Sequence, residues 1–253
     1  MSLTKKNGWV SFLFFIGALS ACVPLAVYAW LGTFSRYLAD DYCASTYLYT
    51  SQNIVEATLR AYSLWGNSYS RLMFSQLIEL GGVNGIRVMA GVELVIWALL
   101  LAWMFVELGK LLRIQIPKIG YVWLACMAIV LSLYQTSALY QILFWRTGVI
   151  PYSLPLLWFI GIAAFFLRYV EKPYEKSRAT WFGILFTILV FFAGGLSETT
   201  SGMLVGIVFV AVALAWWTKW LHQRRDVLAF LIAGLITSII AISITAASPG
   251  TSN

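Results

Sequence analysis

Seven stretches of about 20 residues, each largely apolar, constrain the fold of this chain more than any other feature. They cover approximately residues 9–31, 86–108, 119–141, 150–170, 180–197, 199–219 and 227–247. An α-helix of that length is long enough to cross about 30 Å of hydrocarbon. The composition agrees, because 61% of the residues are hydrophobic and 11% are charged, against about 45–50% and about 25% in soluble domains. The sequence predicts an all-α polytopic membrane bundle with about seven transmembrane helices.

We expect a single membrane domain over residues 1–253. Its parts are a first transmembrane helix (1–32), an outer loop with interfacial helices (33–85), six further transmembrane helices (86–247) and an outer-side tail (248–253). The first apolar stretch is too long for the apolar core of a signal peptide and lacks a convincing cleavage site, so we interpret it as a retained helix. The chain ends directly after the tail, as a truncated or short form would.

The distribution of basic residues predicts the orientation of the bundle. With the N-terminus in the cytoplasm, twelve of the 17 Lys and Arg residues fall on the inner side and five on the outer side. This bias is what the positive-inside rule expects. The same distribution explains the net charge of +7 without a nucleic-acid partner, because the cations lie between apolar stretches and form no single basic face. The three cysteines show no metal-ligand spacing.

The loop between the first two stretches has a helical pattern of its own. Apolar residues recur at helical spacing between Ile54 and Leu80, and the pattern is amphipathic, so this segment should lie along the outer membrane surface. The loop also contains two adjacent carboxylates, Asp40 and Asp41. A carboxylate near the membrane plane can act as a general base when burial or a partner tunes it. The alternative is a solvated pair that caps the next helix.

Further candidate residues lie in the outer segments. Trp65, Tyr69 and Arg71 combine aromatic rings with a cation, which suits sugar stacking and phosphate pairing, although an interfacial aromatic belt with a snorkelling Arg gives the same pattern. Arg146 is the one cation of a tight outer turn, where it could hold a lipid phosphate or make an ordinary headgroup contact. Glu198 lies in a very short break between two apolar stretches, so we expect it to be partly buried and functional.

The order and sidedness of the polar motifs resemble the GT-C superfamily of polytopic membrane glycosyltransferases, and more narrowly an uncharacterised bacterial branch of GT-C-like proteins. The motifs that carry the resemblance are Asp40-Asp41-Tyr42-Cys43, the segment from Trp65 to Arg71, Phe144-Trp145-Arg146-Thr147-Gly148 with Pro151-Tyr152, Gly195 to Glu198, and Ser248-Pro249-Gly250. In one departure from that branch, Gly66-Asn67 stands where a Gly-Arg pair is common.

The resemblance implies transfer of a sugar from a polyprenyl-phosphate donor to an acceptor on the outer face, which is a glycan, a lipid or a protein. Asp40 or Asp41 would be the general base, with a slight preference for Asp41. Arg146, together with Arg71, would neutralise the phosphate of the leaving group. The transfer would invert the sugar's configuration and would require no cofactor. Whether a divalent cation binds at the Asp pair stays an open question.

The resemblance also implies a set of substrate-binding residues. Trp65, Tyr69 and Trp145 would offer stacking faces for a sugar, and Tyr152 and Glu198 belong to the motifs around the same site. The predicted location is the bacterial cytoplasmic membrane, with membrane lipids as neighbours and the active site on the outer face. Two other functions fit the sequence: a transporter or flippase of a lipid-linked saccharide, and a noncatalytic membrane subunit.

Overall fold

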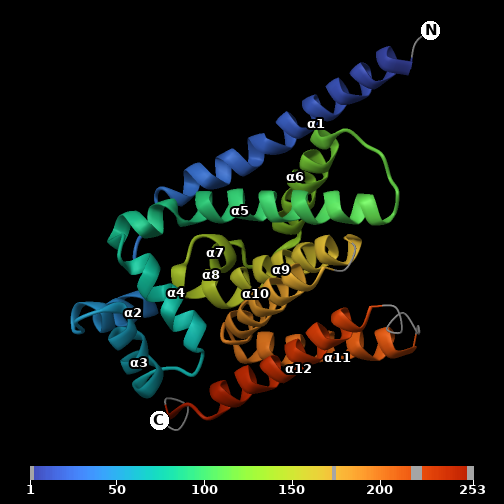
Figure 1. Ribbon diagram of the computed structural model, residues 1–253. Helices are drawn as coiled ribbons and strands as arrows, with labels where there is room; N and C mark the ends of the chain where they lie inside the picture. Colours follow the sequence, from blue (N-terminus) through green and yellow to red (C-terminus); the bar gives the residue numbers. More distant parts are fainter. Residues whose placement is uncertain (1–2, 173–174, 218–223, 250–253) are drawn as a thin grey trace.

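The computed structural model describes residues 3–172, 175–217 and 224–249, and this part of the chain is helical without any strand (Figure 1). Its helices are α1 (Leu3–Gly32), α2 (Asp40–Tyr49), α3 (Ile54–Leu64), α4 (Tyr69–Glu79), α5 (Gly82–Leu111), α6 (Lys118–Gln135), α7 (Leu139–Leu143), α8 (Arg146–Tyr152), α9 (Leu154–Glu171), α10 (Lys176–Gly194), α11 (Glu198–Trp217) and α12 (Arg225–Ala246).

Seven helical segments of the described chain are long and apolar enough to cross a membrane. They are Gly8–Gly32, Gly82–Leu111, Lys118–Gln135, Arg146–Glu171, Lys176–Gly194, Glu198–Trp217 and Arg225–Ala246. Many of their large apolar side chains are exposed, including Phe209 on α11 and Trp217 at its end. Such a surface suits lipid rather than water. The predicted all-α polytopic bundle is therefore confirmed, and the chain is an integral membrane protein.

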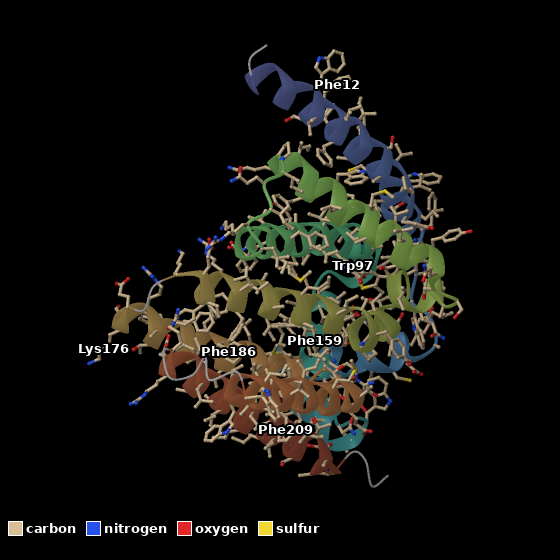
Figure 2. The ribbon with its side chains drawn as sticks, turned by 90° about the vertical axis from the view of Figure 1, so that its right-hand side faces the viewer. Phe12, Trp97, Phe159, Lys176, Phe186 and Phe209 are labelled. Carbon is tan, nitrogen blue, oxygen red and sulfur yellow. The ribbon has the colours of Figure 1, made fainter. Side chains whose placement is uncertain are left out.

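The spanning helices form two packed groups joined by α9. In one group, α1, α5 and α6 bury a core that includes Trp97 and Ile129, and α9 adds Ile160. In the other, α10, α11 and α12 bury Phe182 and its neighbours, to which α9 adds Tyr169. Figure 2 shows Trp97 and Phe186 inside the bundle and Phe12 projecting from the outlying part of α1. Because α9 contributes to both cores, it fixes the position of one group against the other.

The short helices α2, α3 and α4 gather at one end of the bundle, close to the link between α10 and α11 (Figure 1). Lys176 lies at the opposite end, where α10 begins (Figure 2). The predicted amphipathic segment from Ile54 to Leu80 is divided into α3 and α4, because residues 65–68 leave the helical path. At the corner between α4 and α5, Gly82 adopts a φ of 53°, a value that glycine accepts without steric cost.

Most predicted spans agree with the observed helices within a few residues. The largest difference is at the third span, which was predicted to continue to residue 141 but ends at Gln135. The chain leaves the helix at Thr136, whose φ and ψ of −77° and 132° are extended. It then forms the separate helix α7. Apolar composition alone cannot reveal this break, because the residues of α7 are as apolar as those of the span.

Candidate functional site

A buried ion-pair network joins three segments at the end of the bundle that carries α2, α3 and α4. Arg146, at the start of α8, is completely buried. Its Nη1 pairs with Oε2 of Glu79 on α4, and its Nε lies 3.4 Å from Oδ1 of Asp41 on α2. Its Nη2 donates to the Asp41 backbone carbonyl at 2.7 Å and to the Ser45 hydroxyl at 3.2 Å. The guanidinium thus holds α2, α4 and α8 together.

The carboxylate of Asp41 has donors on both of its oxygens. Oδ1 accepts from the backbone N–H and the hydroxyl of Thr147, at 3.1 and 2.5 Å. Oδ2 accepts from the backbone N–H of Leu38 at 3.1 Å. The side chain has no solvent-accessible surface, whereas its neighbour Asp40 is exposed. Asp41 therefore fixes the start of α2, and of the two carboxylates only that of Asp40 is open to solvent.

Tyr37 and Ser45 complete the donors around Glu79. The hydroxyl of Tyr37 donates to Oε1 at 2.7 Å, and that of Ser45 is 2.9 Å from Oε2. Burial, together with the hydrogen bond to Glu79, raises the pKa of Tyr37, so its hydroxyl keeps the proton that it donates. The ring of Tyr37 also lies 5.5 Å from the guanidinium carbon of Arg146. Each buried carboxylate of this network thus has several partners, as stable buried charges require.

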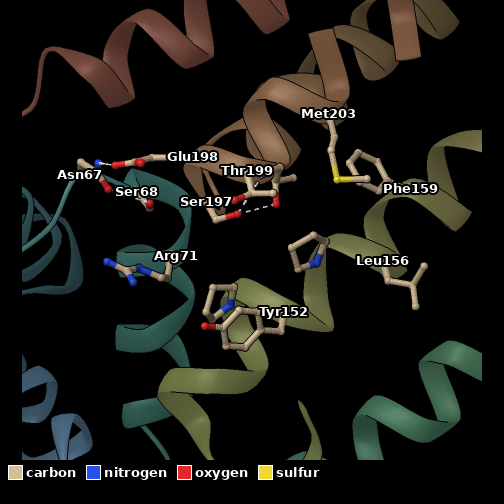
Figure 3. A pocket seen from close by; sticks show the side chains of 13 residues that line it. Asn67, Ser68, Arg71, Tyr152, Leu156, Phe159, Ser197, Glu198, Thr199 and Met203 are labelled. Carbon is tan, nitrogen blue, oxygen red and sulfur yellow. Dashed lines mark hydrogen bonds between the residues drawn. The ribbon is translucent and has the colours of Figure 1, made fainter. Parts of the chain in front are cut away.

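A cleft of about 520 Å³ opens beside this network (Figure 3). Figure 3 shows Arg71, Asn67 and Glu198 on one side of it and Leu156, Phe159 and Met203 on the opposite side. Tyr152, Ser197 and Thr199 lie between them. The walls come from α4 and the link before it, from the junction of α8 and α9, and from the start of α11. The cleft therefore passes from a charged and polar side to an apolar side.

Two backbone contacts hold the polar wall of the cleft in place. The carbonyl of Gly195 accepts from the backbone N–H groups of Ser70 and Arg71, at 3.0 and 3.2 Å, so it caps the first turn of α4. A side chain at Gly195 would overlap the ring of Tyr69, so the close approach requires glycine. The hydroxyl of Ser248 lies 2.9 Å from the carbonyl of Tyr62 and 3.2 Å from that of Gly66. Gly250, the last residue of the predicted motif Ser248-Pro249-Gly250, lies outside the described residues.

Arg71 is the cation of the cleft. Its guanidinium carbon lies 5.7 Å from the centre of the Trp65 ring, and its Nε is buried without a hydrogen-bond partner in the described chain. Burial lowers the pKa of Arg71, and the charges of Asp40 and Glu198 act in the opposite direction. Both carboxylates are therefore close enough to act on this guanidinium. Arg71 is half-buried at the wall of the cleft, and a guanidinium is well suited to bind an anion such as a phosphate.

The other predicted substrate-binding residues differ in their relation to the cleft. Tyr152 and Glu198 line it, and Glu198 is exposed rather than partly buried as expected. Its Oε1 accepts from Nδ2 of Asn67. The hydroxyl of Tyr69 donates to the Phe191 carbonyl at 2.6 Å, so this residue packs against α10. Three residues that were expected to bind substrate thus line the cleft, namely Arg71, Tyr152 and Glu198, and Trp65 lies beside Arg71.

Trp145 and Arg146 are two more expected substrate ligands that the fold uses elsewhere. The indole N–H of Trp145 donates to the Leu38 carbonyl at 3.2 Å and so supports the turn before α2. Sequence reasoning missed Glu79, the main partner of Arg146, because one carboxylate on an amphipathic helix is typical of a solvated face. It also gave Asn67 no role, although this amide holds Glu198 at the cleft. Only the tertiary contacts reveal either residue.

Fold and site together define a helical integral membrane protein with a polar cleft at one end of its bundle. Comparison with known proteins finds no match to the model of any family, to any curated protein or to any solved structure. Within the described ranges, no group of three or more His, Cys, Asp or Glu side chains could hold a metal ion. The function is therefore argued from the geometry of the cleft.

Proposed function

We propose that the chain is a GT-C-like membrane glycosyltransferase that moves a sugar from a polyprenyl-phosphate donor to an outer-face acceptor. The observation that carries the proposal is the graded lining of the cleft. Arg71 and Tyr152 offer a cation and an aromatic ring, and Leu156 and Phe159 continue the wall as apolar surface. A lipid-linked sugar phosphate has the same order of groups, with an anion between hydroxyl groups and an apolar chain.

In the proposed reaction, the oxygen of an acceptor hydroxyl forms a bond to the anomeric carbon of the donor sugar. The bond between that carbon and the phosphate oxygen breaks, and its electron pair leaves with the polyprenyl phosphate. Asp40 takes the proton of the acceptor hydroxyl, as an exposed carboxylate near the cleft can. Arg71 offsets the charge that grows on the leaving phosphate. Protons and charge are balanced without a cofactor.

The remaining cleft residues bind and orient the sugar. Glu198 accepts hydrogen bonds from sugar hydroxyl groups, and Asn67 holds it in position. Tyr152, which is 61% exposed, offers a ring face and a hydroxyl. Arg146 and Asp41 support the site through the buried network, because neither side chain is exposed. The proposed base is thus Asp40, although Asp41 was slightly preferred from the sequence. The proposed phosphate contact is Arg71 in place of Arg146.

The proposed location is the bacterial cytoplasmic membrane, with a cytoplasmic N-terminus and the cleft on the outer face. The bias of Lys and Arg between the two sides supports this orientation. The acceptor is a glycan, a lipid or a protein that reaches the outer end of the bundle.

The test compares lipid-linked sugars and surface glycans in parent cells, in a deletion strain, and in deletion strains that carry variants at equal membrane levels. Asp40→Asn and Arg71→Gln should each fail to restore the missing sugar, and the polyprenyl-phosphate donor should accumulate. The matched controls are Glu175→Gln, at the opposite end of the bundle, and Arg36→Gln, an exposed arginine that donates to the Ser35 carbonyl at 2.8 Å. Both should restore the sugar.

Two outcomes would contradict the proposal. If Asp40→Asn and Arg71→Gln restore the glycan fully, the cleft performs no catalysis, and a noncatalytic subunit becomes the better explanation. If the variants leave a completed lipid-linked saccharide on the inner face, the chain moves that saccharide across the membrane, as a flippase does. Reaction of the labelled saccharide with an impermeant lectin distinguishes these cases.

A further inference from the structure

Glu93 on α5 is a buried acid whose carboxylate lacks the partners that the other buried acids have. Its exposed fraction is 5%, and neither carboxylate oxygen has a hydrogen-bond partner in the described chain. By contrast, Asp41, Glu79 and Glu107 each accept from at least one donor or cation. Buried polar groups without partners are rare in native proteins. An ionisable group of this kind within a membrane-spanning helix indicates a functional site.

Ser153, a polar neighbour of Glu93, already uses its hydroxyl proton in another hydrogen bond. Ser153 has a single hydroxyl proton, and its Oγ lies 2.8 Å from the Ile142 carbonyl and 3.0 Å from the Val149 carbonyl. It therefore has no second proton to donate to Glu93. Glu93 also lines a cavity of about 350 Å³, whose other lining residues are apolar or glycine. A molecule that enters the cavity can supply the partner that this carboxyl group lacks.

The cavity is a groove on the lipid-facing side of the bundle. Four of its lining residues are large, apolar and exposed: Leu77, Val88, Val92 and Ile96. Three of them lie on α5, within one of the segments long enough to span a membrane. The groove shares no lining residue with the cleft that contains Arg71. A molecule that reaches Glu93 thus comes from the bilayer, and it does so without passing through the cleft.

We propose that this groove binds a lipid alcohol, whose chain lies along the apolar walls and whose uncharged hydroxyl group hydrogen-bonds Glu93. A hydroxyl group both donates and accepts, so it satisfies the carboxyl group in either protonation state. An ammonium group would also donate, but moving an ion out of water costs several kcal/mol. An apolar chain without a donor would leave both oxygens unpartnered. The proposal does not depend on the glycosyltransferase assignment.

The experiment uses the full chain in nanodiscs of phosphatidylcholine and a photoreactive diacylglycerol as the probe. The matched probe is the same lipid with its hydroxyl group acetylated. After irradiation, mass spectrometry measures labelling of the peptides that line the groove. We expect the free alcohol to label these peptides about tenfold more than the acetylated lipid, as the loss of one hydrogen bond to a carboxyl group predicts. Equal labelling by the two lipids would refute the proposal.

Variants separate the carboxyl group from the shape of the groove. Glu93→Gln keeps an acceptor and a donor of similar size, so it should retain labelling within about threefold. Glu93→Leu removes both and should reduce labelling by the alcohol to the level of the acetylated lipid. Each variant is first checked for a monodisperse elution profile, which Glu93→Leu should keep because it removes a buried polar group without a partner. Undiminished labelling of a folded Glu93→Leu variant would overturn the proposal.

A second measurement tests access to the carboxyl group from the bilayer. The O–H of a carboxylic acid adds across an apolar carbodiimide, and the adduct rearranges to a stable N-acylurea without losing an atom. Glu93 should react with dicyclohexylcarbodiimide but not with a water-soluble carbodiimide, and the diacylglycerol should slow the reaction more than its acetylated form does. A lack of reaction at Glu93, or equal protection by both lipids, would count against a lipid-accessible site.

Discussion

Replacing Arg146 with methionine tests whether this residue is a structural cation or a substrate ligand. In the wild-type network, one guanidinium stands between the carboxylates of Asp41 and Glu79, and all three side chains are at least 99% buried. Methionine has similar length but no charge, so Arg146→Met leaves two buried carboxylates without their cation. Removing one partner of a buried pair costs about 3–5 kcal/mol. We expect the free energy of unfolding to fall by at least about 3 kcal/mol.

A second substitution should relieve part of that loss. Glu79→Gln alone leaves the Asp41–Arg146 pair intact and should cost about 1–2 kcal/mol, as the weakening of one charged hydrogen bond does. In the Arg146→Met background, the same change removes one of the two uncompensated charges. The double variant should therefore be more stable than Arg146→Met by about 1–3 kcal/mol, a coupling typical of residues in one network.

The assay is unfolding of the purified protein in mixed detergent micelles, followed by tryptophan fluorescence. Arg36→Met is the control, because Arg36 is exposed and bonds only to a neighbouring carbonyl among the contacts described; its effect should stay within about 0.5 kcal/mol. If Arg146→Met proves as stable as this control and loses the proposed glycosyl transfer, the structural interpretation is wrong. Arg146 would then be the substrate ligand that the sequence suggested.

Three further predictions concern the supports of the site. Gly195→Ala should destabilise the fold or displace α4, because a side chain there would overlap the Tyr69 ring; a normal unfolding midpoint would contradict this. Trp145→Phe should lower stability by about 0.5–1.5 kcal/mol, because the Leu38 carbonyl loses its donor, and the proposed glycosyl transfer per folded molecule should not change. Ala39→Gly should raise stability by up to about 1 kcal/mol, because Ala39 has a φ of 45°, a value that is unfavourable for a residue with a side chain. An unchanged or lower unfolding midpoint would show that this strain is absent.

The sequence predicts the spanning helices well because hydrophobicity accumulates over about 20 residues and tolerates local irregularity. It predicts the roles of single polar residues less well. Asp40 and Asp41 are neighbours in the chain, yet successive residues of a helix point about 100° apart, so one carboxylate is exposed and the other is buried. No pattern within the loop distinguishes them, because the difference depends on where α8 places Arg146.

Arg71 and Glu198 could be selected from the sequence because charges are scarce in this chain and both fall in outer segments. Glu79 could not, because its importance comes from a partner 67 residues away. Arg146 was selected as a phosphate ligand for the same reason that it is important to the fold: it is a cation in an apolar turn. Composition shows that such a residue needs an anion, but only the packing shows that the protein supplies that anion itself.

The buried network also has a consequence for the order in which the chain assembles. The contact between Arg146 and Asp41 spans 105 residues, and that between Arg146 and Glu79 spans 67. During synthesis, α2 and α4 are complete before the ribosome reaches α8. Until then, Asp41 and Glu79 lack the cation that neutralises them, and water must solvate both carboxylates. Helices α2 and α4 can therefore reach their final positions only after the start of the fourth membrane-spanning segment has been made.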